Sequence, residues 1–275
     1  MGSDPIYRPS HILAPMIDIG ANLVNTAFRN DLDAVISRAR AAGVRHIIVT
    51  GTDLDSSRAA HALCARHEGM LSATAGIHPH DAKDATDATL QAILGLLDQP
   101  EVRAVGETGL DFNRNYSPRD IQERVFEQQL ELAASTGMPV FVHERDTGTR
   151  LAEILARHRA RLSHVVIHCF TGTGEMLERF LDLDCHIGIT GWVCDERRGS
   201  EIQELVPRIP EDRLMIETDA PFLLPRTIEP RPKERRNEPA LLVWVARKIA
   251  ALRGESIDAV AGYTEANARR FFHLP

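Results

Sequence analysis

The sequence predicts an α/β protein that folds as a single (β/α)8 TIM barrel. Three observations support this fold: short apolar runs alternate with amphipathic segments, the runs number eight, and no repeat or long linker divides them. Short apolar runs that alternate with helical segments are typical of parallel strands buried on both faces. The length of 275 residues also suits one domain, since barrels of this kind commonly use roughly 250.

The apolar runs are expected to form the eight strands of the barrel. They are Met16–Gly20, His46–Thr50, Leu71–Ala75, Val102–Gly106, Pro139–His143, His164–His168, Cys185–Ile189 and Leu214–Thr218. An open, doubly wound sheet is the alternative arrangement of such units. However, no GxGxxG fingerprint follows the first run and no Walker loop is present. The count of eight therefore favours a closed barrel.

The segments between the runs carry signals for helix starts and ends. Asn30 is expected to cap a helix whose apolar residues share one face, and Gly43 is expected to end it. Ser117 is expected to cap a longer helix with Pro118 in its first turn, and this helix should stop at Gly137.

The first fifteen residues, MGSDPIYRPSHILAP, are rich in turn formers and lack periodicity. We expect residues 1–15 to be a flexible extension or a remnant of cloning, and residues 16–275 to form the barrel domain.

Composition narrows the classes of function. A net charge of −7 argues against a protein that coats nucleic acid non-specifically, although a metal or a local basic patch can still attract phosphates. No apolar run approaches the roughly 20 residues that cross a bilayer, so we expect no membrane partner. We also expect a monomer. The four cysteines form no CxxC pair, and a reducing cytoplasm is the simplest location for them. They are Cys64, Cys169, Cys185 and Cys194.

Polar residues end four of the apolar runs. Glu107 follows the fourth, His143 and His168 end the fifth and sixth, and Asp219 follows the eighth. In a barrel these strand ends converge at one mouth, where loops build the active site. One histidine at a strand end is usually only hydrogen-bonded, but that explanation must then apply independently at each position. We therefore predict a divalent metal site made of imidazole and carboxylate ligands.

Other residues near the predicted mouth are candidates for substrate contacts. His78 follows the third run and is expected to hold a phosphate or donate a proton, whereas its neighbour His80 suits a turn. Arg145, two residues beyond His143, is expected to bind substrate. The segment 109–112 should bend the chain over the mouth, and its Asp111 either orients a metal ligand or shapes a turn.

A basic segment follows the eighth run. A solvated loop is one explanation for it, and steering of phosphates toward the mouth is the other. We expect Arg235 and Arg236 in this segment to bind substrate. Trp192 could stack on a base or pack in the core, and the sequence leaves both open. The basic residues of the segment are Arg226, Arg231, Lys233, Arg235 and Arg236.

With these motifs in place, the chain resembles the TatD family of metal-dependent deoxyribonucleases. The motifs occur in order from Met16 to Pro275, and several are long enough to be specific. The segments that carry the resemblance are AGIHPHD (75–81), VGETGLDF (105–112), PVFVHERD (139–146), VVIHCFTGT (165–173), GITGWVCDERR (188–198), IETDAPFLLPR (216–226) and RRNEPA (235–240).

The resemblance implies a TIM-barrel nuclease that works 3′ to 5′ on single-stranded DNA and also on RNA. It implies Mg²⁺ as the cofactor, with Mn²⁺ or Zn²⁺ as alternatives. It also implies metal roles for four residues and a substrate or catalytic role for His78. The four are Glu107, His143, His168 and Asp219.

Two positions depart from the family pattern. Many relatives carry an H-x-H pair at the end of the first strand, where this chain has Gly20–Ala21–Asn22. We therefore expect one tight metal site and leave a second one open. Glu144 stands where relatives often have Cys, and it is expected to add negative charge near the mouth.

These residues suggest a mechanism and two rival functions. A bound ion would activate a water molecule, and Asp219 would take the proton of that water. An amidohydrolase-type C–N hydrolase is the first alternative, but such enzymes usually need the missing H-x-H pair and often a carboxylated lysine where Glu107 stands. A barrel that binds a partner without catalysis is the second.

Overall fold

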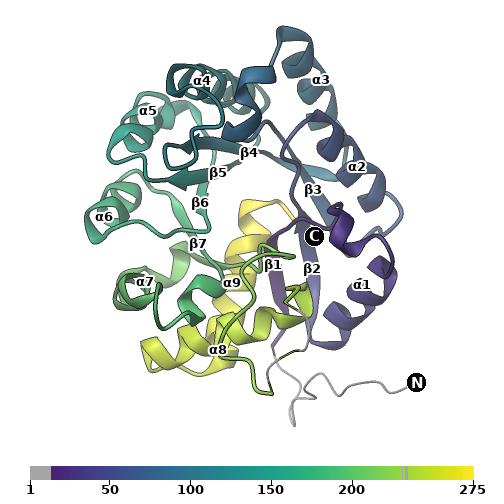
Figure 1. Ribbon diagram of the computed structural model, residues 1–275, viewed down its shortest axis with the longest axis vertical. Coiled ribbons are helices and arrows are strands. Elements are labelled where there is room, and N and C mark those ends of the chain that lie inside the picture. The colour runs from purple at the N-terminus through teal and green to yellow at the C-terminus, as the bar shows by residue number, and fades with distance from the viewer. Residues whose placement is uncertain (1–13, 231, 233–234) are drawn as a thin grey trace.

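The computed structural model describes residues 14–230, 232 and 235–275, and in them eight parallel strands follow one another in the order β1 to β8 (Figure 1). The ends of this sheet meet through a bridge between Ala21 and Ala220, and the N–H of Asn22 donates to the Ala220 carbonyl at 2.7 Å. The expected barrel is thus confirmed, in a nearly closed form. The strands are β1 (Met16–Ala21), β2 (Val44–Val49), β3 (Leu71–Ala75), β4 (Val102–Asp111), β5 (Val140–Arg145), β6 (Val165–His168), β7 (His186–Ile189) and β8 (Leu214–Ile216).

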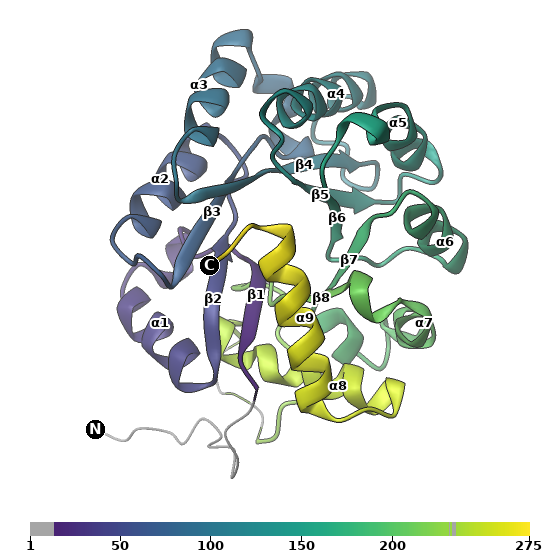
Figure 2. The same cartoon turned by 180° about the vertical axis from the view of Figure 1, so that it is seen from behind.

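Helices form a layer around the outside of the sheet (Figure 1). They are α1 (Leu32–Ala41), α2 (Leu54–Cys64), α3 (Asp87–Leu97), α4 (Arg119–Thr136), α5 (Arg150–His158), α6 (Gly174–Asp182), α7 (Ser200–Leu205), α8 (Leu242–Arg253) and α9 (Ile257–Phe271). The last of them lies close to β1 and β8 (Figure 2). Phe271 and Phe272 at its end pack with Ile17 and Ile19 in the buried barrel interior. Phe271 also contacts His186, which begins β7. The amino-terminal end of the barrel is therefore filled with apolar side chains, and the opposite end is left for chemistry.

The fourth strand is longer than the sequence suggested. It continues beyond Gly106 to Asp111, and Gly109 pairs with His143 of β5. Gly109 has a φ of +139°, and a Cβ placed there would come within 2.0 Å of the His143 carbonyl oxygen. The absent side chain thus lets the two strands stay paired. The prediction that residues 109–112 bend over the mouth is wrong, because most of them belong to the strand.

Both predicted helix caps lie one residue early. α1 begins after Asp31 rather than Asn30, and the Asp31 carboxylate makes no capping bond. The position before α4 is Pro118 rather than Ser117. The Ser117 hydroxyl instead donates to the His80 carbonyl at 2.8 Å, so tertiary contacts compete with capping at this residue.

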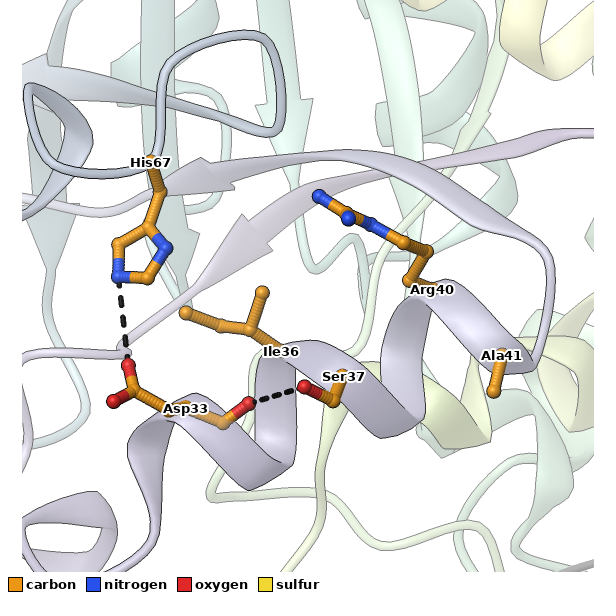
Figure 3. A pocket seen from close by; sticks show the side chains of 6 residues that line it. All are labelled: Asp33, Ile36, Ser37, Arg40, Ala41 and His67. Atoms are coloured by element: carbon orange, nitrogen blue, oxygen red, sulfur yellow. Dashed lines mark hydrogen bonds and ion pairs between the residues drawn. The ribbon is translucent and has the colours of Figure 1, made fainter.

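No helix within the described residues is long and apolar enough to span a membrane. Residues 1–13 and the basic residues Arg231 and Lys233 fall outside the described part of the chain. A pocket on α1 includes no predicted site residue, and its Asp33 lies 3.6 Å from His67 (Figure 3). Its lining residues are Asp33, Ile36, Ser37, Arg40, Ala41 and His67.

Candidate active site

Neighbouring strands bring the predicted histidines and Glu107 together at the carboxyl end of the barrel. Glu107 lies on β4, His143 on β5 and His168 at the end of β6, and the two histidines are register partners. His78 lies in the segment that follows β3. The residue before it, Ile77, is fixed by the buried side chain of Gln129, whose amide oxygen accepts the Ile77 N–H and whose amide nitrogen donates to the Ile77 carbonyl. The expected convergence of strand ends therefore occurs for these four residues.

One oxygen of Glu107 is the centre of this group. Its Oε1 lies 2.7 Å from His168 Nε2, 3.0 Å from His143 Nδ1 and 3.3 Å from His78 Nε2. Glu107 is buried, and so is His168. A buried carboxylate without compensating positive charge is strongly unfavourable, so this carboxylate needs the imidazoles or a cation beside it.

The pKa shifts show how the group balances its charge through protons. Burial alone would raise the pKa of Glu107, but the neighbouring histidines outweigh it and hold that pKa well below its usual value. Burial would likewise lower the pKa of His168, but Glu107 and Glu217 raise it well above normal. The pKa of His143 is also raised, since Asp111 and Glu107 outweigh its burial. The rings of His143 and His168 therefore hold protons next to the Glu107 carboxylate, and a bound cation would replace those protons.

His78 differs from the other two rings in its hydrogen bonds. Its Nδ1 accepts the backbone N–H of His80 at 3.1 Å. Burial lowers the pKa of His78 to about 4, so the ring is neutral near pH 7. Because Nδ1 accepts a fixed donor, the single ring proton must sit on Nε2, which faces Glu107. His78 is therefore a hydrogen-bond donor toward the site.

Asp111 forms a second layer behind the histidines. Its Oδ2 lies 2.6 Å from His80 Nε2 and 3.5 Å from His143 Nε2. Its Oδ1 accepts the N–H groups of Asn113 and Arg114, which shape the turn after β4. Both roles considered for Asp111 are thus present. His80 does more than form a turn, because its ring joins this network.

Asp219 lies on the β8 side of the mouth and is held from β1. Its N–H donates to the Gly20 carbonyl at 2.8 Å, and its Oδ1 accepts the Asn22 amide at 3.0 Å. Asn22 lies where many relatives have the second histidine of the H-x-H motif, and in this chain its side chain orients Asp219. Burial raises the pKa of Asp219 to about 7, and Glu107 and Glu217 contribute to the rise.

Two further buried carboxyl groups lie near the site, and the sequence predicted no role for either. Glu217 is fully buried, and its Oε2 lies 3.4 Å from His168 Nδ1. A Cβ at Gly20 or Gly188 would approach the Glu217 carboxylate within 2.5 and 2.7 Å, so these glycines make room for it. Asp18 is also buried and accepts the Thr218 N–H at 2.9 Å. The only sequence signal for either was an acid within or beside an apolar run.

The predicted substrate residues are placed differently from one another. Arg145 shares the β5 face of His143, since side chains two apart point the same way, and it donates to Thr171 at 2.9 Å. Arg235 is exposed. Arg236 is instead bound by both carboxylate oxygens of Asp31 at 2.7 Å, so a substrate contact would require breaking that pair.

Two further residues were expected near the mouth. Glu144 is buried and accepts both the N–H and the hydroxyl of Thr147, so its charge stabilises a turn. Trp192 is half-buried, with the Arg198 guanidinium 5.9 Å from its ring.

The donor atoms fit a divalent cation. Ligand atoms of His78, Glu107 and His143 all lie within 4.8 Å of one another. Beside them, the buried His168 Nδ1 and Glu217 Oε2 make no hydrogen bond of good geometry. A ligating histidine commonly holds its second nitrogen toward a carboxylate, as His168 does here. Distance alone would include His78 among the ligands, but the proton on its Nε2 favours a contact with substrate.

A family model described as TatD related DNase matches residues 17–273. The chain belongs to the TatD family. A relative from Erwinia billingiae, named 3'-5' ssDNA/RNA exonuclease TatD, is 49% identical over 260 residues, which cover 94% of this chain and 100% of the relative. A relative of the same name from Escherichia fergusonii is 49% identical over 259 residues and covers 94% and 99%.

Solved structures of TatD proteins share the fold. The TatD homologue YJJV from Escherichia coli is 31% identical with a TM-score of 0.85, over 94% of this chain and 98% of that one. A TatD family hydrolase from Entamoeba histolytica is 25% identical with a TM-score of 0.87, over 96% and 100%. Together with the histidine and glutamate cluster, this family membership indicates a divalent metal site.

Proposed function

We propose that this protein is a metal-dependent 3′-5′ exonuclease that hydrolyses the phosphodiester bonds of single-stranded DNA and RNA. The observation that carries the proposal is the Glu107 carboxylate shared by three imidazoles at the mouth of a TatD-family barrel. The two bacterial relatives bear names that state this activity. No observation favours a C–N hydrolase or a barrel without catalysis.

The proposed metal ligands are Glu107, His143 and His168, with Asp219 joining when substrate is present. Mixed nitrogen and oxygen donors accept Mg²⁺, Mn²⁺ or Zn²⁺, and Mg²⁺ is the ion we propose. When bound, the ion supplies Lewis acidity at the phosphoryl oxygen and lowers the pKa of water. We propose one tight site, because Gly20–Ala21–Asn22 stands where many relatives carry the H-x-H pair of the first strand.

The side chains then divide the remaining work. Asp219 takes the proton of the attacking water, and its buried position beside Asn22 holds the carboxylate in place for this role. His78 donates from Nε2 to a non-bridging phosphate oxygen, where negative charge grows in the transition state. Arg145 and Arg235 are the proposed phosphate contacts, whereas Arg236 remains with Asp31.

The oligomeric state and the location are also proposals. We propose a monomer in the cytoplasm, and the four cysteines support the location because none forms a disulfide.

The test is a nuclease assay on single strands labelled at the 3′ or the 5′ end. Mg²⁺, Mn²⁺, Zn²⁺ and chelator are compared for wild type, Glu107→Ala and His168→Ala. We expect immediate release of the 3′ label and stepwise shortening of the 5′-labelled strand, both abolished by chelator and by either substitution. His67→Ala, in the pocket of Figure 3, is the matched control and should stay active. Activity in chelator would exclude the metal, and loss of the 5′ label first would exclude the polarity.

A further inference from the structure

Two large apolar side chains are exposed in the described part of the chain. Tyr116 is 54% exposed and Phe222 is 52% exposed. Tyr116 lies in the loop after β4, and Phe222 lies in the loop after β8. Strands four positions apart in a ring of eight leave the barrel on opposite sides. Because both loops follow the carboxyl ends of strands, both aromatic rings lie at the catalytic end of the barrel, on opposite sides of its mouth.

Tyr116 is connected to the active site through a chain of contacts. Its ring lies edge-on to His80, with centroids 4.7 Å apart and planes at 68°. His80 in turn bonds Asp111, which lies beside His143. The phenol oxygen accepts a bond from Arg114 at 3.3 Å. The ring is thus held from one side while about half of it remains open to solvent.

Phe222 is held through its backbone. Its N–H donates to the Asp219 carbonyl at 3.0 Å, and the preceding Pro221 carbonyl accepts the Asn237 N–H at 3.0 Å. The ring therefore projects from a fixed turn three residues after the proposed general base. Exposing a phenyl ring is unfavourable in water, and the position of this ring at the catalytic end leaves it free to meet a substrate.

The chemistry of the mouth points to nucleobases as the occupant. A net charge of −7 gives little general attraction for a polyanion. Stacking of bases on aromatic rings adds binding that is independent of sequence, because every base has a π-face. This kind of binding suits an enzyme that must accept each new terminal nucleotide as the strand shortens.

We propose that Tyr116 and Phe222 each stack on one nucleobase, on opposite sides of the phosphodiester bond that is cut. One ring holds the base of the 3′-terminal nucleotide and the other holds the base of the nucleotide before it. This inference rests on the proposed function and identifies how that site grips its substrate. A docking surface for a partner protein is the competing use of the same rings.

The test pairs protein variants with oligonucleotides that lack one base. An abasic unit is placed at the 3′-terminal or the penultimate position, and kcat and KM are measured for each strand. In wild type, each missing base should lower kcat/KM by about 5- to 140-fold, the range expected for one stacked base. Tyr116→Ala should remove the penalty at one position and Phe222→Ala the penalty at the other.

The conservative variants Tyr116→Phe and Phe222→Tyr are the controls, because they keep an aromatic ring and should keep both penalties. Melting temperatures verify that each variant is folded. Alanine variants that keep wild-type penalties at both positions would overturn the stacking role and favour a partner-protein surface.

A binding assay separates this inference from the proposed function. Fluorescence anisotropy of the same oligonucleotides in chelator measures affinity without cleavage. Abasic penalties in Kd with no cleavage in any metal would refute the exonuclease and keep the stacking role. Cleavage with no penalty in Kd or kcat/KM for either missing base would refute the stacking role and keep the exonuclease. A protein that neither binds nor cleaves would overturn both.

Discussion

Glu107 Oε1 faces three imidazole rings, and two of those rings, His143 and His168, have raised pKa values. A metal ligand must present a free lone pair, so a cation has to displace protons from these rings. Metal affinity and proton release are therefore linked at the level of single residues. The same reasoning separates His78, whose neutral ring keeps its proton on Nε2.

The first prediction follows from this linkage. Mn²⁺ binding to the wild-type protein should release about two protons per ion, one from each of the His143 and His168 rings, and tighten as the pH rises from 6 to 8. Isothermal titration calorimetry in two buffers of different ionisation enthalpy measures the release. Glu107→Gln keeps the shape but removes the charge, so it should weaken Mn²⁺ binding by about 100-fold or more. Equal affinity in this variant would contradict the proposed ligand.

The second prediction concerns the general base. Asp219→Asn keeps the size of the side chain but cannot take a proton. We expect kcat to fall by about 10²-fold or more while oligonucleotide affinity in chelator stays near that of wild type. Single-turnover kinetics at saturating metal measures the effect. Asn22→Ala, which removes only the partner of Asp219, should cost less. Normal turnover in Asp219→Asn would rule out its role as the base.

At the scale of elements, the loop between β8 and α8 has two kinds of basic residue. Arg236 ties this loop to the start of α1 through Asp31, and its guanidinium lies 5.1 Å from the Phe28 ring. The bond from Arg236 lowers the pKa of Asp31 to about 2, and that from Arg38 adds to it. Arg235 beside it is exposed. Neighbouring residues of one sequence motif thus face different surroundings.

The third prediction uses this contrast. Arg236→Ala should lower the free energy of unfolding by about 1 kcal/mol, because both partners are partly exposed, and leave KM nearly unchanged. The loss should disappear as the pH falls from about 4 to 2, where Asp31 becomes protonated even in the folded state. Arg235→Ala should keep the melting temperature and reduce the salt slope of log KM by about 0.7. A raised KM and a reduced salt slope in Arg236→Ala, with its stability unchanged, would show instead that Arg236 binds substrate.

At the scale of the whole molecule, the two ends of the barrel have separate tasks. The carboxyl end carries the proposed catalytic residues, and the amino-terminal end is closed by Phe271 and Phe272 at the end of α9. Two histidines at the closed end, His46 and His186, are buried, and burial lowers the pKa of each to about 4. These residues affect stability rather than chemistry.

The fourth prediction concerns acid stability at this closed end. A histidine with a lowered pKa in the folded state stabilises the fold above its unfolded pKa of 6.5 and loses that contribution as the pH falls toward 4. As the pH falls from 7 to 5, the His186 ring takes up a proton in the unfolded chain but stays neutral in the folded protein. This residue alone should therefore lower the free energy of unfolding by about 2 kcal/mol over that range. Denaturant titrations of wild type and His186→Gln measure the difference. Parallel pH profiles for the two proteins would contradict it.

Much of the fold and of the proposed metal site was predictable from the sequence, for a common reason. The period of apolar runs reports which segments are strands, and parallel strands place their carboxyl ends together. Glu107, His143 and His168 could therefore be brought together from position alone. Helix caps and the end of β4 were less predictable, because Asp31 and Ser117 make distant contacts in place of local ones.

The tertiary structure decided which distant residues become partners. Arg236 meets Asp31, 205 residues away, and Asp219 meets Asn22 across the seam between β8 and β1. Glu217 is buried because two glycines from other strands leave space for its carboxylate. Such pairings depend on where chain segments meet in three dimensions, and the periodicity of one segment carries no information about its distant neighbours. The sequence thus determined the barrel and the residues at its mouth, whereas tertiary packing determined the protonation state and the bonding partner of each of those residues.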